Sequence, residues 1–115
     1  GQVAQAVQEM GLLKGSGLSI ERVDKSIAGD IDVLTDSYII EVKESLGGVK
    51  KKQFDKFINP NHPDYFNFDG KGIIYYIEDI TIKNRYNQEI LEMLQNTENV
   101  TVVHTLDELK GVLLQ

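Results

Sequence analysis

Acidic residues and one lysine are concentrated in a short segment between residues 29 and 43, which contains Asp30, Asp32, Glu41 and Lys43. Carboxylates that share a small space repel one another, at a cost of about 1 kcal/mol in water and about 4 kcal/mol near a protein surface. A divalent cation removes that repulsion. Mg²⁺ is commonly held by one or two carboxylates together with water and phosphate oxygens. The segment therefore predicts a metal site.

Mg²⁺ is the ion that we expect at this site, with Mn²⁺ as the alternative. Zn²⁺ is disfavoured because the chain has no cysteine, and because His62 and His104 are far apart in the sequence. We expect His62 to be a loop residue, since it lies between Asn61 and Pro63 without a partner at ligand spacing. His104 follows a buried strand, and we expect it to serve the entry to the last helix.

The acidic segment is predicted to fold as a β-hairpin, because β-branched residues alternate with polar ones on both sides of Asp36-Ser37. If those two residues form the loop, Asp32 is opposite Glu41. Directly opposed residues share a face of the sheet. One face then carries the chemistry: Asp30, Asp32, Leu34, Ile39, Glu41 and Lys43. The other is predicted to be the core face: Ile31, Val33, Thr35, Tyr38, Ile40 and Val42.

The remaining elements predict a single α/β domain over residues 1–115 with a mixed central sheet. Apolar spacing favours a helix over residues 2–13, and a glycine-rich break at 14–17 precedes a strand over 18–23. Gly47-Gly48 precedes a helix of about ten residues. Further strands are expected at 73–77 and 100–103, and further helices at 84–96 and after the capping sequence at Thr105. The chain begins with Gly1, and we expect it to be a piece of a longer polypeptide.

Charge is unevenly distributed along the chain. The net charge of −6 argues against a nucleic-acid binder when taken as a whole. Residues 43–56, however, hold five lysines against Glu44 and Asp55, and so carry +3 against −9 elsewhere. This basic strip is compatible with a polyanionic substrate, and a solvated helix face is the alternative. No apolar stretch is long enough to span a bilayer, so no membrane partner is predicted. The lack of cysteine suits a reducing cytoplasm.

The hairpin resembles the PD-(D/E)XK nuclease superfamily. Gly29-Asp-Ile-Asp32 is similar to the G-E-[apolar]-D variant of the family, and Glu41-Val-Lys43 is similar to its ExK motif. The resemblance implies a restriction-endonuclease-like core, a mixed central sheet flanked by helices. It implies that Asp32 and Glu41 bind the metal, that Lys43 orients the attacking water or stabilises the phosphorane charge, and that Asp30 acts from behind the ligands.

The resemblance extends to the flanking helices. Many members carry a glutamate on the first helix, where this chain has Gln5, with Glu9 one turn further on. This departure from the pattern leaves a third acidic ligand open. Many members also carry lysine and glutamine on the helix after the ExK motif, facing the substrate. The matching substrate-binding candidates here are Lys50, Lys51, Lys52, Gln53 and Lys56.

The motif pair looks particularly like the restriction-endonuclease-fold toxin domains of bacterial polymorphic toxins, including contact-dependent growth inhibition effectors. That likeness implies an excised C-terminal domain of a secreted or cell-surface effector that acts in the target-cell cytoplasm. It implies hydrolysis of transfer RNA, with DNA as the close second, and a cognate immunity protein as partner.

Two other functional classes stay open. One is a non-catalytic binding or adaptor module on the same fold, which would bind no metal. The other is an immunity or adaptor protein with an acidic surface, although a lysine among the carboxylates speaks against it. In the long loop after residue 59, Tyr65, Phe66 and Phe68 could stack on unpaired bases or pin the loop to the body. Tyr75 and Tyr76 are expected to be packing residues.

Overall fold

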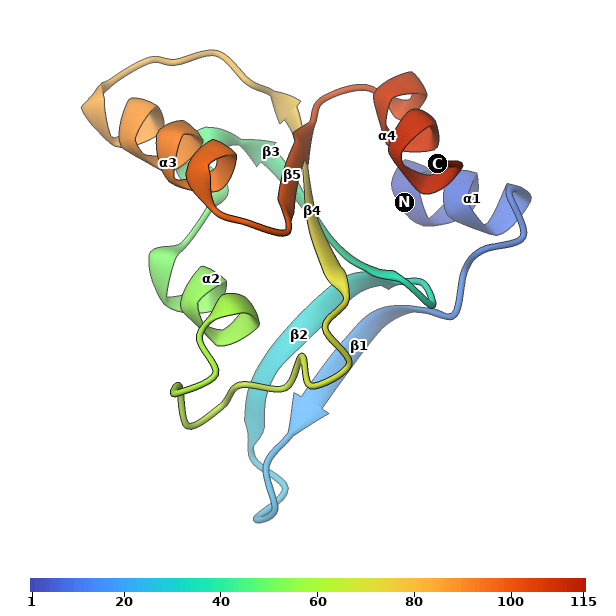
Figure 1. The fold of residues 1–115 in the computed structure, drawn as a ribbon, viewed down its shortest axis with the longest axis vertical. Helices are drawn as coiled ribbons and strands as arrows, with labels where there is room; N and C mark the ends of the chain where they lie inside the picture. Colours follow the sequence, from blue (N-terminus) through green and yellow to red (C-terminus); the bar gives the residue numbers. More distant parts are fainter.

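A mixed five-stranded sheet runs through the centre of the molecule, with its strands in chain order from β1 to β5 (Figure 1). The computed structural model describes residues 1–115. The strands are β1 (Gly15–Glu21), β2 (Ile27–Leu34), β3 (Tyr38–Ser45), β4 (Gly72–Asp79) and β5 (Val100–Val103). The helices are α1 (Gln2–Glu9), α2 (Lys51–Ile58), α3 (Arg85–Asn96) and α4 (Leu106–Leu113), and a short 3-10 turn, η1, covers Leu46–Gly48. The predicted mixed α/β architecture and the predicted order of elements are confirmed.

The direction of the strands changes at β3. Strand β2 is antiparallel to both of its neighbours, β1 and β3. Strand β4 is parallel to both of its neighbours, β3 and β5. Parallel neighbours need a crossover connection, and α2 and α3 provide the two crossovers. Both helices lie on one side of the sheet, and α1 and α4 lie on the other (Figure 1).

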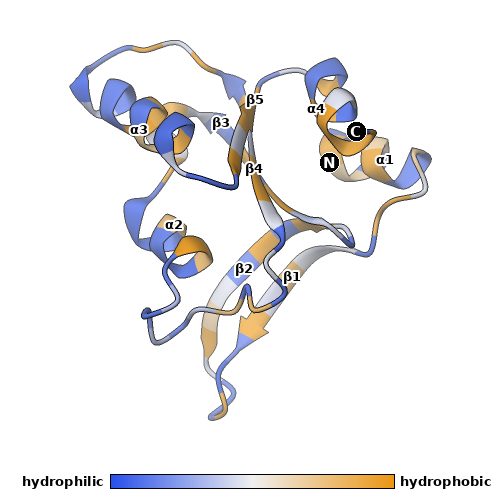
Figure 2. Ribbon diagram, in the orientation of Figure 1, coloured by the Kyte–Doolittle hydropathy of each residue, from blue (hydrophilic) through white to orange (hydrophobic).

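The sheet is buried on both faces, with one apolar cluster on each. On the α2–α3 side the cluster includes Phe54 and Phe57 from α2 and Ile90 and Leu94 from α3. On the α1–α4 side it includes Val3, Val7, Val33, Ile40 and Leu109. Apolar residues follow the strands and the inward faces of the helices, while the outer faces are polar (Figure 2). Every residue from Ile73 to Ile77 is buried, as the apolar run predicted.

The hairpin forms with the predicted register beside its loop, but the predicted pairing of Asp32 with Glu41 is not formed. Val33 pairs with Ile40, and Leu34 pairs with Ile39. Asp36 and Ser37 form the loop, and the Thr35 N–H donates to the Tyr38 carbonyl at 3.0 Å. The Thr35 hydroxyl accepts from the Tyr38 N–H at 2.9 Å, which fixes the turn. These contacts confirm the two-residue loop on which the active-site hypothesis depends.

The expectation of a single core face on the hairpin was wrong. Ile39 and Glu41, both assigned to the polar face, are fully or almost fully buried, because α2 and α3 cover that side. Ile31 packs with Ile39 on the α2–α3 side and not with Val33. Beyond Val33 no further residue pair of β2 and β3 is formed, and β2 curves away from the centre of the sheet (Figure 1). Because the two strands diverge, Ile31 does not follow the alternation of faces that is expected of a straight strand pair.

Two element boundaries also differ from prediction. Helix α1 ends at Glu9 and not at residue 13, because Gly11 takes a φ of +75°, which a helix cannot continue. Strand β1 starts at Gly15 within the expected break, where Gly17 takes a φ of +58°. None of the helices combines the length and the apolar character needed to cross a membrane.

Candidate metal centre

Three carboxylates meet where β2 diverges from β3. Asp30, Asp32 and Glu41 each place an oxygen within 4.8 Å of the others. Asp30 is exposed, Asp32 is half-buried and Glu41 has no exposed surface. The cluster therefore grades from solvent into the core. Such a gradient allows a ligand to enter at Asp30 and be held at Glu41.

Asp32 and Glu41 are locked to one another through the backbone. The Asp32 N–H donates to Glu41 Oε2 at 3.1 Å, and the Val42 N–H donates to Asp32 Oδ2 at 2.8 Å. In each case a side chain of one strand accepts a hydrogen bond from the backbone of the other. These bonds lie beyond the last backbone pairing of β2 with β3. Asp32 Oδ1 has no protein donor, and each Glu41 oxygen keeps a lone pair, because an ionised carboxylate offers about four acceptor sites.

Glu41 is electrostatically costly in its charged form. Burial, and then the neighbouring charge of Asp32, raise the pKa of Glu41 to about 8, with a smaller contribution from Asp30. The N–H of Asp32 and the ammonium of Lys43 act in the opposite direction without outweighing burial. A buried carboxylate with a raised pKa is a group that a cation would stabilise.

Gln53 joins the lysine to the carboxylates. Its Oε1 accepts from Lys43 Nζ at 3.1 Å, and its Nε2 donates to Glu41 Oε1 at 3.1 Å and to Asp30 Oδ1 at 3.3 Å. The side chain projects from the first turn of α2, which follows β3 and η1 in the chain. The amide thus fixes the position of Lys43 beside the cluster. Sequence analysis assigned Gln53 to substrate contact, and here it lies within the site itself.

The Tyr75 hydroxyl lies in the same buried region and has no hydrogen-bond partner. Tyr75 is directly opposite Glu41 in the parallel pair of β3 and β4. Burial, and then the charges of Glu41 and Asp32, raise the pKa of Tyr75. Sequence analysis treated Tyr75 as a packing residue, because the pairing of β4 with β3 cannot be read from an apolar run.

Gln5 and Glu9 lie outside the cluster. The Gln5 amide donates to Glu9 Oε1 at 3.3 Å, and both residues line a hollow with Leu106 and Lys110 of α4. Helix α1 turns its apolar residues toward the sheet and leaves these two exposed. The position for a third acidic ligand on the first helix is therefore not filled by either residue.

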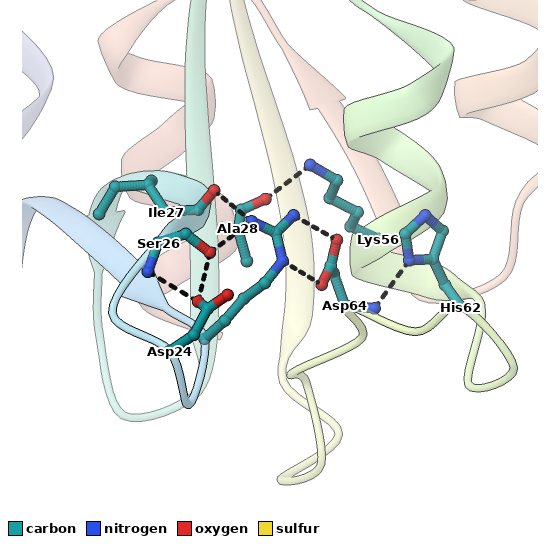
Figure 3. A network of polar contacts seen from close by, with 8 residues as sticks. Asp24, Ser26, Ile27, Ala28, Lys56, His62 and Asp64 are labelled. Carbon is teal, nitrogen blue, oxygen red and sulfur yellow. Dashed lines mark hydrogen bonds and ion pairs between the residues drawn. The ribbon is translucent and has the colours of Figure 1, made fainter.

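The basic strip is only partly free. Lys56 Nζ donates to the Ala28 carbonyl at 2.6 Å, which ties α2 to β2 (Figure 3). Lys51 lies 4.0 Å from Glu89 and 5.7 Å from the Tyr86 ring centroid. Three lysines are exposed at the start of α2: Lys50, Lys51 and Lys52. Lys52 makes no side-chain contact, and Lys50 reaches only the Gly47 carbonyl, at 3.4 Å.

The long loop after α2 is pinned to the hairpin that joins β1 and β2. Arg22 makes two hydrogen bonds to Asp64, of 3.0 and 2.9 Å, and His62 Nδ1 accepts from the Asp64 N–H (Figure 3). His62 is thus a loop residue, as expected. Phe66 packs edge-on against Phe57 with ring centroids 5.4 Å apart, so it anchors the loop to the apolar core.

Phe68 is the one aromatic residue of this loop that stays open to solvent. It is 82% exposed, and its ring meets Tyr65 at a centroid distance of 5.3 Å. The Tyr65 hydroxyl in turn donates to the Asn67 carbonyl at 2.8 Å. Of the three aromatic residues considered for base stacking, Phe68 alone presents most of its ring.

His104, by contrast, contributes to helix capping. Its N–H donates to Glu108 at 2.9 Å, and its imidazole lies 3.4 Å from the same carboxylate. The Thr105 hydroxyl accepts from the Glu108 N–H, which is one half of the predicted capping box. The Glu108 carboxylate accepts from His104, one residue before the cap, and not from Thr105.

Comparison with family models, curated proteins and solved structures gave no match. What the chain does must therefore be inferred from its own side chains.

Proposed function

We propose that this chain is a metal-dependent nuclease of the PD-(D/E)XK type. The observation that carries the proposal is that Asp30, Asp32 and Glu41 share one small space, while Gln53 forms hydrogen bonds with both Lys43 and Glu41. A charge cluster without function would be expected to lie exposed, where water screens it. Here one carboxylate is fully buried instead.

The donor set fits a hard divalent cation. All available ligands are carboxylate oxygens, and both histidines are engaged elsewhere. Asp32 and Glu41 would hold the ion, with Asp30 at the solvent side. Oxygen ligands of this kind suit Mg²⁺ first, Mn²⁺ next and Zn²⁺ less. When bound, such an ion offsets charge on phosphate oxygens and lowers the pKa of water at the site.

In this proposal Lys43 is the residue that acts on the scissile phosphate. An ammonium has three donors, and Gln53 takes one of them. The other two are free to orient the attacking water and to stabilise the negative charge that develops on phosphorus oxygens. In the reaction a water oxygen bonds to phosphorus and gives up one proton to solvent, the bond to the leaving oxygen breaks, and that oxygen takes up a proton from solvent.

The fold is consistent with the family that the motifs resemble. The aspartate is on one strand, the ExK motif is on the next, and a helix bearing lysines and glutamine follows. We propose a restriction-endonuclease-like core on this basis. The departure at Gln5 and Glu9 indicates that two or three carboxylates of the hairpin suffice for the metal.

For the biological role, we propose an antibacterial toxin domain of a secreted or cell-surface effector. It would act in the target-cell cytoplasm and be neutralised by a cognate immunity protein. Transfer RNA is the favoured substrate and DNA the second. The exposed lysines of the basic strip are Lys50–Lys52, a surface too narrow to follow a long duplex, and exposed Phe68 suits an unpaired base.

A direct test is incubation of the pure protein with total RNA and with plasmid DNA, each with Mg²⁺, Mn²⁺ or EDTA. Cleavage of either substrate that EDTA abolishes supports the nuclease. The matched control is Asp32→Asn, which removes one charge and keeps an acceptor for Val42. Equal cleavage by the variant would show that the activity does not come from this site. Absence of both metal binding and cleavage would favour the non-catalytic binding module.

A further inference from the structure

Tyr75 has a buried hydroxyl that nothing in the fold satisfies. The residue has no exposed surface, and its oxygen finds no donor or acceptor. Leaving a buried hydroxyl without a partner costs about 1–3 kcal/mol. Phenylalanine would fill the same space beside Phe54, whose ring centroid is 6.0 Å away, without that cost. The hydroxyl therefore calls for a partner that the protein chain does not supply.

The acidic cluster lies on the same face of the sheet as the Tyr75 side chain. Tyr75 and Glu41 are directly paired on adjacent strands, so their side chains project from the same face. Glu41 and Asp32 are the two charged groups that act on the phenol. Neither carboxylate is within hydrogen-bond distance, so a small molecule between them and the phenol is the missing partner. A buried water needs two to four polar partners, and these three groups provide them.

We infer that Tyr75 is a positioning residue of the metal centre, whose hydroxyl holds the Glu41 carboxylate through one buried water molecule. The inference rests on the proposed function, since it assigns a new residue to that site. The water accepts a hydrogen bond from the phenol and donates one to the carboxylate. Glu41 is otherwise held by Gln53 and by the Asp32 N–H. The phenol adds a support from the core side, opposite the side where solvent enters.

Tyr75→Phe removes this support and leaves the volume unchanged. Groups that orient metal ligands are worth about 10–100-fold in metal affinity, so we expect the Kd for Mn²⁺, measured by calorimetry, to rise about tenfold. The melting temperature in EDTA should stay the same or rise slightly. Tyr76→Phe is the matched control. Tyr76 is nearly as buried but lies on the opposite face of β4, and it should bind Mn²⁺ like the wild type.

An unchanged Mn²⁺ affinity in Tyr75→Phe would overturn the inference and leave the nuclease standing. If the wild type binds no metal, the proposed function fails, and a high-resolution crystal structure of the metal-free protein decides the inference. Water within hydrogen-bond distance of both the Tyr75 hydroxyl and a Glu41 oxygen would support the positioning role. A crystal structure with no water at the Tyr75 hydroxyl would overturn it, whether or not the protein binds metal.

Discussion

The N–H of Asp32 donates a hydrogen bond of 3.1 Å to the carboxylate of Glu41, across two strands that have stopped pairing through their backbones. The Val42 N–H returns the bond to Asp32 at 2.8 Å. The two carboxylates are thus fixed side by side by the same contacts that replace the ladder. The same carboxylate oxygens accept backbone hydrogen bonds and carry the negative charge. Isosteric amide variants remove the charge and keep an oxygen that can accept.

Asp32→Asn and Glu41→Gln should abolish metal-dependent cleavage without unfolding the protein. Each variant keeps an oxygen that can accept from the backbone and removes one of the repelling charges. The melting temperature in EDTA should therefore be unchanged or higher. Asp32→Ala, in contrast, leaves the Val42 N–H without its acceptor and should lose about 1 kcal/mol of stability. Thermal unfolding and a cleavage assay on the same preparations test this. Wild-type cleavage by both isosteric variants would require a different active site.

The stability of the metal-free protein should fall as pH rises from about 4.5 to about 8. Glu41 has a pKa raised to about 8 in the fold, against 4.5 as its ordinary value. The folded state therefore binds the proton more tightly than the unfolded state, and that advantage disappears as the folded carboxyl ionises. The change is on the order of a few kcal/mol. Urea unfolding in EDTA across this range measures it. Glu41→Gln should flatten the dependence, and an equal slope in both proteins would contradict the prediction.

Lys43→Ala should abolish cleavage while metal binding is largely retained. The lysine donates to Gln53 and lies beside the carboxylates, but it is no metal ligand. Gln53→Ala should lower kcat about tenfold by releasing the ammonium, a typical cost for a group that orients another. Lys110→Ala is the control, since Lys110 is exposed on α4, on the other side of the sheet from the site. Calorimetry with Mn²⁺ alongside kinetics separates the two effects. Loss of metal binding in Lys43→Ala would contradict the assigned role.

Reversing Lys51 and Lys52 to Glu should weaken substrate binding and flatten its salt dependence. These exposed lysines would contact phosphates, and each contact contributes about 0.7–0.9 to the slope of log affinity against log salt. Lys110→Glu is the control. It makes the same charge reversal at one residue of α4, on the other side of the sheet. Binding of transfer RNA at several salt concentrations measures the slopes. A loss in Lys110→Glu as large as in the pair would indicate a general charge effect.

Phe68→Ala should weaken binding of single-stranded nucleic acid more than binding of duplex. Phe68 is 82% exposed, and stacking of a base on an aromatic ring is worth about 1–3 kcal/mol. Ile82→Ala is the control, because Ile82 is also an exposed apolar residue but belongs to the connection between β4 and α3. Fluorescence anisotropy with matched oligonucleotides tests the difference. Equal affinities for wild type and Phe68→Ala would show that the ring serves the loop alone.

The sequence by itself determined the hairpin and its register. Asp36-Ser37 set the loop, and the alternation of apolar and polar residues then required Val33 to face Ile40 and Leu34 to face Ile39. Local rules suffice here because the paired residues are close in the chain. The order of elements followed from apolar periodicity for the same reason, as did the capping contact between Thr105 and Glu108.

Only the tertiary structure decided which side chains complete the site. Gln53 reaches Glu41 and Lys43 because α2 crosses over the sheet, and Tyr75 lies beside Glu41 because β4 pairs in parallel with β3. Both contacts depend on how another element packs against β3, which the pattern within one segment does not show. The burial of Glu41 has the same origin, since a second layer of helices covers the face that the alternation had marked as polar. A period of two shows which residues share a face, but it cannot show whether that face meets water or another layer of the protein.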